Sequence, residues 1–185
     1  RRRFSADNGG VTRQAIIIDC DPGVDDAVAL FLAFASPEDL EILAVTTAAG
    51  NVDATLTARN ARLVRQLAGR EEVPVYAGAA VPLVREPIAA AHFHGESGLG
   101  TLPVFEPAAP VAPGHAASAI VDLVMSRPAG SVAMAVTGPM TNLAIALRLR
   151  PDIASKIKRL VFMGGQVHVP GNASRAAEFN FWFDP

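Results

Sequence analysis

The chain has 185 residues, half of them apolar, with 16 basic and 18 acidic side chains and a formal net charge of -2. This apolar content is enough for one sizeable core, and the near-neutral charge gives no field for binding a phosphate backbone, so nucleic acid is not the expected partner. The single cysteine, Cys20, excludes an internal disulfide framework and a cysteine-based zinc cluster, and the cytoplasm is the expected location.

The first 14 residues are expected to lie outside the folded core. They begin with three arginines and contain no long apolar stretch, so we expect a flexible arm or an expression remnant rather than a signal peptide.

An uncharged stretch over 128–147 is long enough to span a bilayer. Because Gly138 and Pro139 interrupt it at its centre, we interpret it as a strand, a turn and the start of a helix, and expect no membrane association.

Strand and helix patterns alternate along the rest of the chain. Short β-branched runs predict strands buried on both faces, and longer stretches with helical apolar spacing predict helices. In chain order the patterns predict a strand at 15–20, a helix at 24–35, a strand at 40–47, a helix at 52–67, a strand at 73–76, a helix at 116–126, a strand at 131–136, a helix at 140–149 and a strand at 158–163. This alternation predicts an α/β fold with an open, mostly parallel sheet and helices on both faces.

Four carboxylates fall within eight residues at the end of the first predicted strand: Asp19, Asp21, Asp25 and Asp26. The last two lie in the first turn of the next predicted helix, where the helix dipole favours negative charge. Four carboxylates this close repel one another unless a cation lies between them. Hard oxygen ligands select Ca²⁺ or Mg²⁺, and clustered carboxylates with carbonyls favour Ca²⁺.

Two other interpretations of this cluster stay open. Acidic residues at a helix N-terminus ordinarily act as caps, although four of them beside a Pro-Gly turn exceed what capping needs. An Asp-x-Asp pair also occurs in phosphatases with an aspartyl nucleophile, which would be Asp19 here. Those enzymes carry Thr or Val where this chain has Gly23.

Polar residues follow several other predicted strands. Asp21, Asn51, Thr137 and Met163 each come just after a strand or at its carboxyl end. In open α/β sheets the ligand binds at the carboxyl ends of the strands. The loops that carry these residues are therefore expected to converge on one crevice.

Six segments of the chain, in order, resemble one family. They are residues 19–26 (DCDPGVDD), 46–51 (TTAAGN), 94–100 (HGESGLG), 137–142 (TGPMTN), 163–165 (MGG), and 171–174 (GNAS) together with 178–180 (EFN). With these motifs the chain resembles the inosine–uridine-preferring nucleoside hydrolases over nearly everything from Ile16 to Pro185.

The resemblance implies a calcium-dependent hydrolase of nucleoside salvage, which breaks the N-glycosidic bond of ribonucleosides and releases ribose and free base. Asp21, Asp26 and the main-chain carbonyl of Thr137 would bind Ca²⁺. Asp21 would also be the general base for the attacking water, and Asp25 would accept a hydrogen bond from a ribose hydroxyl. Asp19 would orient its neighbours.

The resemblance also assigns residues to the substrate. Amide and carboxylate groups suit a sugar because they bind several hydroxyls at once. Met163 would pack on the ligand, and His94 would contact the nucleobase or line the mouth of the site. The remaining substrate-binding residues would be Asn51, Asn172, Glu178 and Asn180.

Members of this family continue through a C-terminal part that carries a His-Asp pair. Residues 15–185 are therefore expected to be the N-terminal part of a single nucleoside hydrolase domain, truncated at its C-terminus and catalytically incomplete by itself. The family also implies a homodimer or homotetramer. Two other hypotheses stay open: a noncatalytic remnant that binds nucleoside or ribose in a metal-dependent way, and the phosphatase.

Overall fold

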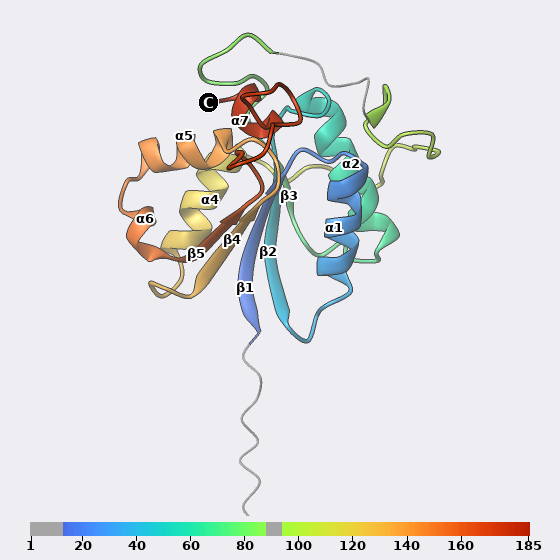
Figure 1. The fold of residues 1–185 in the computed structure, drawn as a ribbon. Coiled ribbons are helices and arrows are strands. Elements are labelled where there is room, and N and C mark those ends of the chain that lie inside the picture. The colour runs from blue at the N-terminus through green and yellow to red at the C-terminus, as the bar shows by residue number, and fades with distance from the viewer. Residues whose placement is uncertain (1–12, 88–93) are drawn as a thin grey trace, which may run out of the picture.

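The computed structural model describes residues 13–87 and 94–185 (Figure 1). In chain order the elements are β1 (Gln14–Cys20), α1 (Val24–Phe34), β2 (Leu40–Thr47), α2 (Ala54–Leu67), β3 (Val75–Ala77), α4 (Ala116–Met125), β4 (Val132–Val136), α5 (Thr141–Leu149), α6 (Ile153–Lys156), β5 (Ile157–Phe162) and α7 (Phe179–Phe183). Residues 1–12 of the predicted arm lie outside the described residues. Its predicted end at residue 14 is wrong, because Gln14 already pairs with Leu40 in the sheet.

The five described strands form one sheet in the order β3-β2-β1-β4-β5, and every neighbouring pair is parallel. The predicted open, parallel α/β fold is therefore confirmed. The chain moves outward in one direction from β1 to β3 and then crosses to the other side of β1 with β4. A ligand crevice in such a sheet lies at the carboxyl ends of the strands where the order reverses, which here is the boundary between β1 and β4.

Helices cover both faces of the sheet (Figure 1). The helices α1 and α2 pack on one face, where Ile18, Leu30 and Val64 belong to one buried cluster. The helices α4, α5 and α6 pack on the other face, in a second cluster that includes Ile17 and Met134. Consecutive residues of β1 therefore serve opposite cores, which explains why this strand is apolar on both faces.

Most predicted elements are confirmed within two residues at each end. The third strand begins at Val75 rather than at 73, and the last one ends at Phe162. The short helices α6 and α7 are absent from the prediction, because four or five residues are too few to show a helical period. The uncharged stretch 128–147 contains β4, a turn and most of α5, as predicted.

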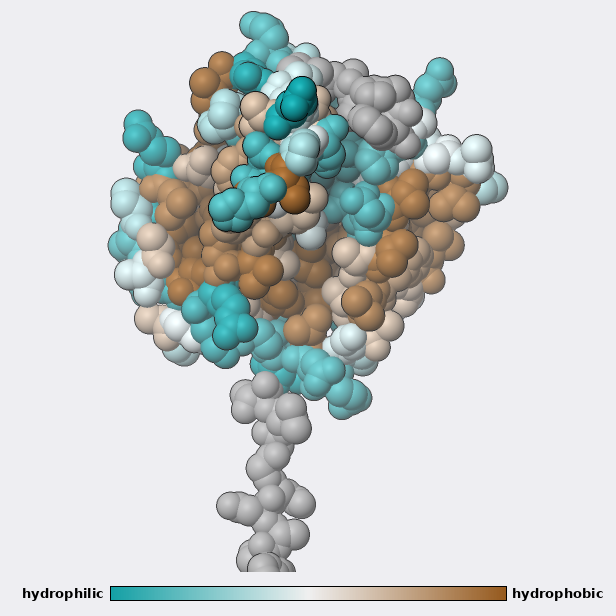
Figure 2. Space-filling view, in the orientation of Figure 1, coloured by the Kyte–Doolittle hydropathy of each residue, from teal (hydrophilic) through white to brown (hydrophobic). Residues whose placement is uncertain are grey.

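Apolar side chains are exposed on α1 and β5. On α1, Val28 is 65% and Leu32 70% exposed, and on β5, Val161 is 58% exposed. Figure 2 shows these two elements as apolar areas on one face of the molecule. No helix among the described residues is both long and apolar enough to cross a membrane.

Candidate active site

Loops at the carboxyl edge of the sheet enclose a cavity of about 300 Å³. Asp21 follows β1, Asn51 follows β2, Thr137 follows β4 and Met163 follows β5, so the predicted convergence of these strand ends is confirmed. The cavity is lined by all the predicted site residues except Asp19, together with one residue that was not predicted: Asp21, Asp25, Asp26, Asn51, His94, Thr137, Met163, Asn172, Glu178, Phe179 and Asn180.

Asp21 is held at the floor of this cavity by the two neighbouring loops. Its side chain is buried, and its Oδ2 accepts a hydrogen bond of 2.7 Å from the backbone N–H of Asn51. A Cβ atom on Gly50 would lie 2.0 Å from Asp21 Oδ2, and one on Gly138 would lie 2.5 Å from Oδ1. Only glycine lets both loops approach the carboxylate this closely.

Asp26 is the second buried carboxylate of the cavity. Its Oδ1 accepts a hydrogen bond of 2.6 Å from Thr137 Oγ1, and its Oδ2 accepts one of 3.1 Å from the backbone N–H of Gly23. Asn51 Nδ2 also donates to Oδ2, at 3.3 Å, and donates to the carbonyl of Asp21. Asn51 thus connects the two acidic residues.

Both carboxylates are costly to keep ionised in this position. Burial raises the pKa of Asp21 well above its ordinary value, and the charge of Asp26 raises it further. Burial also raises the pKa of Asp26, although the hydrogen bond from Thr137 opposes this shift. A cation bound between the two groups would remove the repulsion and restore their charged forms.

The donor atoms here suit part of a Ca²⁺ shell. Besides the two carboxylates, the Thr137 carbonyl accepts one hydrogen bond, from Asn180 Nδ2 at 2.9 Å, and keeps a second lone pair. Within 13–87 and 94–185, no three His, Cys, Asp or Glu side chains are grouped closely enough to hold an ion by themselves. A shell of about six to eight oxygens therefore needs ligands beyond these residues.

The opposite wall is built by the start of α7. Glu178 is buried, and its carboxylate accepts hydrogen bonds from the backbone N–H groups of Asn180, Phe181 and Gly165 at 2.9, 3.3 and 2.9 Å. These bonds cap the helix and hold the turn after β5. Asn180 joins two strand ends, because its Nδ2 donates to the carbonyls of Thr137 and Met163.

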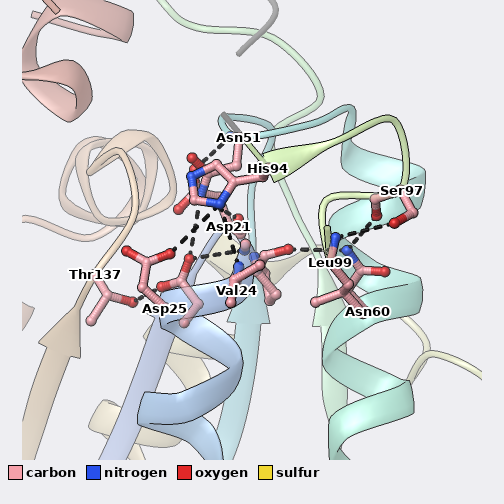
Figure 3. Close-up of polar contacts among 12 residues, drawn as sticks. Asp21, Val24, Asp25, Asn51, Asn60, His94, Ser97, Leu99 and Thr137 are labelled. Carbon is pink, nitrogen blue, oxygen red and sulfur yellow. Dashed lines mark hydrogen bonds and ion pairs between the residues drawn. The ribbon is translucent and has the colours of Figure 1, made fainter. Parts of the chain in front are cut away.

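The mouth of the cavity is formed by more exposed residues. The Asp25 side chain is 80% exposed, and its Oδ1 lies 4.0 Å from Nδ1 of His94 (Figure 3). Met163 is 50% exposed. Asn172 is also exposed, and its Oδ1 accepts a hydrogen bond of 2.8 Å from the backbone N–H of Phe179. These positions are open to a ligand.

Comparison with known proteins shows the family. A model of the inosine-uridine preferring nucleoside hydrolase family matches residues 16–185. An inosine-uridine preferring nucleoside hydrolase from Crithidia fasciculata is 49% identical over 173 residues, which are 92% of this chain and 54% of that protein.

The chain belongs to the inosine-uridine preferring nucleoside hydrolase family.

Other members of the family support the same assignment. A pyrimidine-specific ribonucleoside hydrolase from Photobacterium profundum is 46% identical, and the match covers 92% of this chain and 54% of that protein. The solved structure of a plant nucleoside hydrolase superposes with a TM-score of 0.87 at 37% identity and covers 93% of this chain and 54% of that chain. The chain thus spans about half the length of the relatives it matches.

Asp19 lies beneath the cavity and not in its wall. It is 1% exposed, and its Oδ1 accepts hydrogen bonds from Thr46 Oγ1 at 2.6 Å and Asn142 Nδ2 at 2.9 Å. Asn142 also donates to the Thr47 carbonyl and so joins the ends of β1 and β2. Buried in this way, Asp19 does not reach a substrate phosphorus, which argues against the phosphatase hypothesis.

Two features of the site were missed in the sequence. Phe179 lines the cavity, although its position between Glu178 and Asn180 was the only signal for it. Asn142 fixes the strand ends below the site, and its amide side chain at the start of a predicted helix gave no sign of this role. Contacts between residues more than 60 positions apart decide the role of Asn142.

Proposed function

We propose that the protein hydrolyses the N-glycosidic bond of ribonucleosides and releases ribose and free base. The observation that carries this proposal is the cavity itself, where two buried carboxylates face a wall of amide and carboxylate groups that suits a sugar. The names of the relatives include purine-preferring and pyrimidine-specific ribonucleoside hydrolases. Their substrates differ in the base and share the ribose, so we define the proposed substrate class by its ribose.

Asp21, Asp26 and the Thr137 carbonyl would hold a Ca²⁺ ion, which when bound supplies a Lewis acid that polarises a water molecule. Asp21 is the proposed general base, because it lines the cavity and, as a ligand of the ion, would lie within reach of the water that the ion binds. Asp25 would accept a hydrogen bond from a ribose hydroxyl.

The ribose would be held on its other side by the α7 wall. Glu178 uses its carboxylate oxygens for three backbone N–H groups, and a carboxylate has about four acceptor positions. One position therefore stays open for a hydroxyl donor. Asn51 and Asn172 would supply further polar contacts, and Phe179 and Met163 would provide apolar surface at the cavity rim.

The experiment that tests this proposal measures reducing sugar released from inosine and uridine, with and without a calcium chelator, on protein of known intact mass. Release that the chelator abolishes supports the proposal. Nucleoside binding without release, on the product of the complete coding sequence, would instead establish the noncatalytic binding protein. Phosphate release from a phosphomonoester would overturn both.

Two finer expectations belong to the same proposal. A cytoplasmic location is supported by Cys20, which is buried and unpaired. Assembly into a homodimer or homotetramer is supported by the exposed apolar side chains of α1, such as Val28 and Leu32. Light scattering on the purified protein tests the oligomeric state directly.

A further inference from the structure

A compact turn over residues 94–100, called the 94–100 turn below, lies beside the mouth of the cavity. The N–H of Gly100 donates a hydrogen bond of 2.7 Å to the carbonyl of His94 and closes the turn. Leu99 is 2% exposed and belongs to the core cluster under α1 and α2. The turn is therefore fixed to the domain at its far end, while His94 begins it at the site.

A single side chain connects this turn to the segment after β1. Asn60 on α2 is fully buried, and its Nδ2 donates to the carbonyl of Pro22 at 3.0 Å and to the carbonyl of Ser97 at 2.9 Å (Figure 3). Its Oδ1 accepts a hydrogen bond of 2.9 Å from Arg59, whose guanidinium also donates to the Ser97 carbonyl at 3.0 Å. Every polar atom of the Asn60 amide is thus satisfied by this bridge.

His94 packs on the same segment that Asn60 holds. Its Nδ1 lies 3.4 Å from the backbone N–H nitrogen of Val24 and 4.0 Å from Asp25 Oδ1. A Cβ atom on Gly23 would lie 2.8 Å from Nδ1, so the ring rests directly on the backbone. These contacts of the ring are few and long, so they do not fix it by themselves.

We propose that Asn60 is a positioning residue that fixes the imidazole of His94 at the mouth of the cavity. By binding the Pro22 and Ser97 carbonyls at once, it sets the distance between the 94–100 turn and the start of α1. This inference rests on the proposed function in one respect, the identity of the ligand that the His94 ring contacts, which is a bound nucleoside. The anchor itself is a property of the fold.

Gly98 offers an independent way to break the same anchor. Its φ is +82°, and a Cβ atom there would lie 2.8 Å from Asn60 Nδ2. Gly98→Ala therefore strains the turn and pushes against the Asn60 amide without changing α2. Thr57→Ala is the matched control, because Thr57 is a fully buried polar residue of the same helix whose hydroxyl bonds only within α2.

The first test follows the His94 ring by NMR on protein with labelled histidine, its signal assigned by its loss in His94→Gln. Asn60→Ala and Gly98→Ala are expected to shift or broaden this signal, while Thr57→Ala leaves it in place. A His94 signal that is unchanged in Asn60→Ala, or in Gly98→Ala if the first variant does not fold, overturns the proposal. This measurement needs no catalytic turnover.

The second test is a double-mutant cycle on kcat/KM for inosine hydrolysis by the product of the complete coding sequence. Asn60→Ala is expected to lower kcat/KM about tenfold to a hundredfold in the native background. In the His94→Gln background, Asn60→Ala is expected to lower kcat/KM less than about twofold, because the imidazole that Asn60 positions is absent. Additive losses would show that Asn60 acts independently of His94 and would overturn the proposal. Absence of turnover in every protein would refute the proposed function, and the NMR result would still decide the anchor.

Discussion

Two buried carboxylates with raised pKa values, Asp21 and Asp26, share Asn51 as a hydrogen-bond donor at the carboxyl edge of the sheet. Burying two like charges destabilises a fold through their repulsion and their lost hydration, so such a pair indicates a functional site. Among the other cavity residues, Glu178 caps α7 and Asp25 is exposed at the mouth. At the residue scale, the proposed chemistry therefore depends on the two buried acids.

Asp21→Asn is expected to lower kcat by about 10²- to 10⁴-fold, because the amide cannot accept a proton. Calcium affinity, measured by titration calorimetry, should fall with it. In the absence of calcium, thermal denaturation is expected to show a Tm no lower than native, since the amide removes a buried like charge. Asp25→Asn is the control and should keep calcium affinity, because that side chain is largely exposed. Native calcium affinity in Asp21→Asn would contradict the assignment.

Asn172→Ala and Glu178→Gln are expected to distinguish a residue that only binds the substrate from one that also stabilises the fold. Asn172 is exposed and makes a single hydrogen bond, to the backbone of Phe179, so its removal should leave Tm nearly unchanged. It should cost several kcal/mol of transition-state binding, on the order of 10²-fold or more in kcat/KM. Glu178→Gln should lose both activity and Tm, because the carboxylate holds three backbone N–H groups. A purely thermal effect of Asn172→Ala would indicate a structural role.

The elements of the sheet are held together by side chains near their ends. At the amino edge, Arg127 after α4 makes a two-pronged ion pair with Glu41 of β2, at 2.8 and 3.0 Å. At the carboxyl edge, Asn142 donates to the Asp19 carboxylate and to the Thr47 carbonyl, and Asn180 donates to two backbone carbonyls. A few polar contacts near the strand ends thus help to fix the positions of these elements.

The Glu41–Arg127 pair gives a pH dependence of stability. The hydrogen bond from Arg127 lowers the pKa of Glu41, so the pair stabilises the fold above the unfolded pKa and loses this effect as pH falls through the folded value. Both side chains are more than a third exposed, so the effect should be under about 1 kcal/mol. Glu41→Gln is expected to lower Tm slightly at pH 7. The difference from native should vanish below about pH 4, and a constant difference would contradict this explanation.

Over the whole molecule, the described residues leave some apolar surface uncovered. The outer strand β5 is exposed along most of its length, and α1 presents Val28 and Leu32 to solvent (Figure 2). The cavity offers two carboxylates and a carbonyl to a cation that takes about six to eight oxygens. The relatives are about twice as long as the matched region.

A polypeptide of residues 1–185 alone is therefore expected to release no ribose from inosine or uridine. It is also expected to bind a hydrophobic dye, because its exposed apolar strand and helix remain uncovered. The inosine-uridine preferring nucleoside hydrolase from Crithidia fasciculata, assayed in parallel, is the positive control. Turnover by a 185-residue polypeptide of verified mass would refute this expectation.

The sequence was sufficient to predict the sheet, the edge that carries the site and nearly all of the cavity lining. Strand and helix periods are local, and the carboxyl ends of parallel strands meet at one edge whatever the details of packing. The four-carboxylate cluster after the first strand also predicts an ion site at this edge, which stays a prediction. Short helices such as α7 could not be predicted, since five residues are too few to show a helical period.

Only the tertiary structure shows which contacts each polar residue makes. Residue type alone leaves Asp19 and Asp21 equivalent, and the family resemblance gives Asp19 only an orienting role; in the fold Asp19 is buried beneath the cavity, whereas Asp21 lines it. Asn60 fits an apolar helical stripe in the sequence, yet it bridges Pro22 and Ser97 across the site. A side chain's partners across the chain depend on how the helices pack on the sheet, and that packing is not encoded in local spacing. The sequence by itself thus determined the fold class, the family resemblance and the place of the site, whereas long-range contacts decided the arrangement within it.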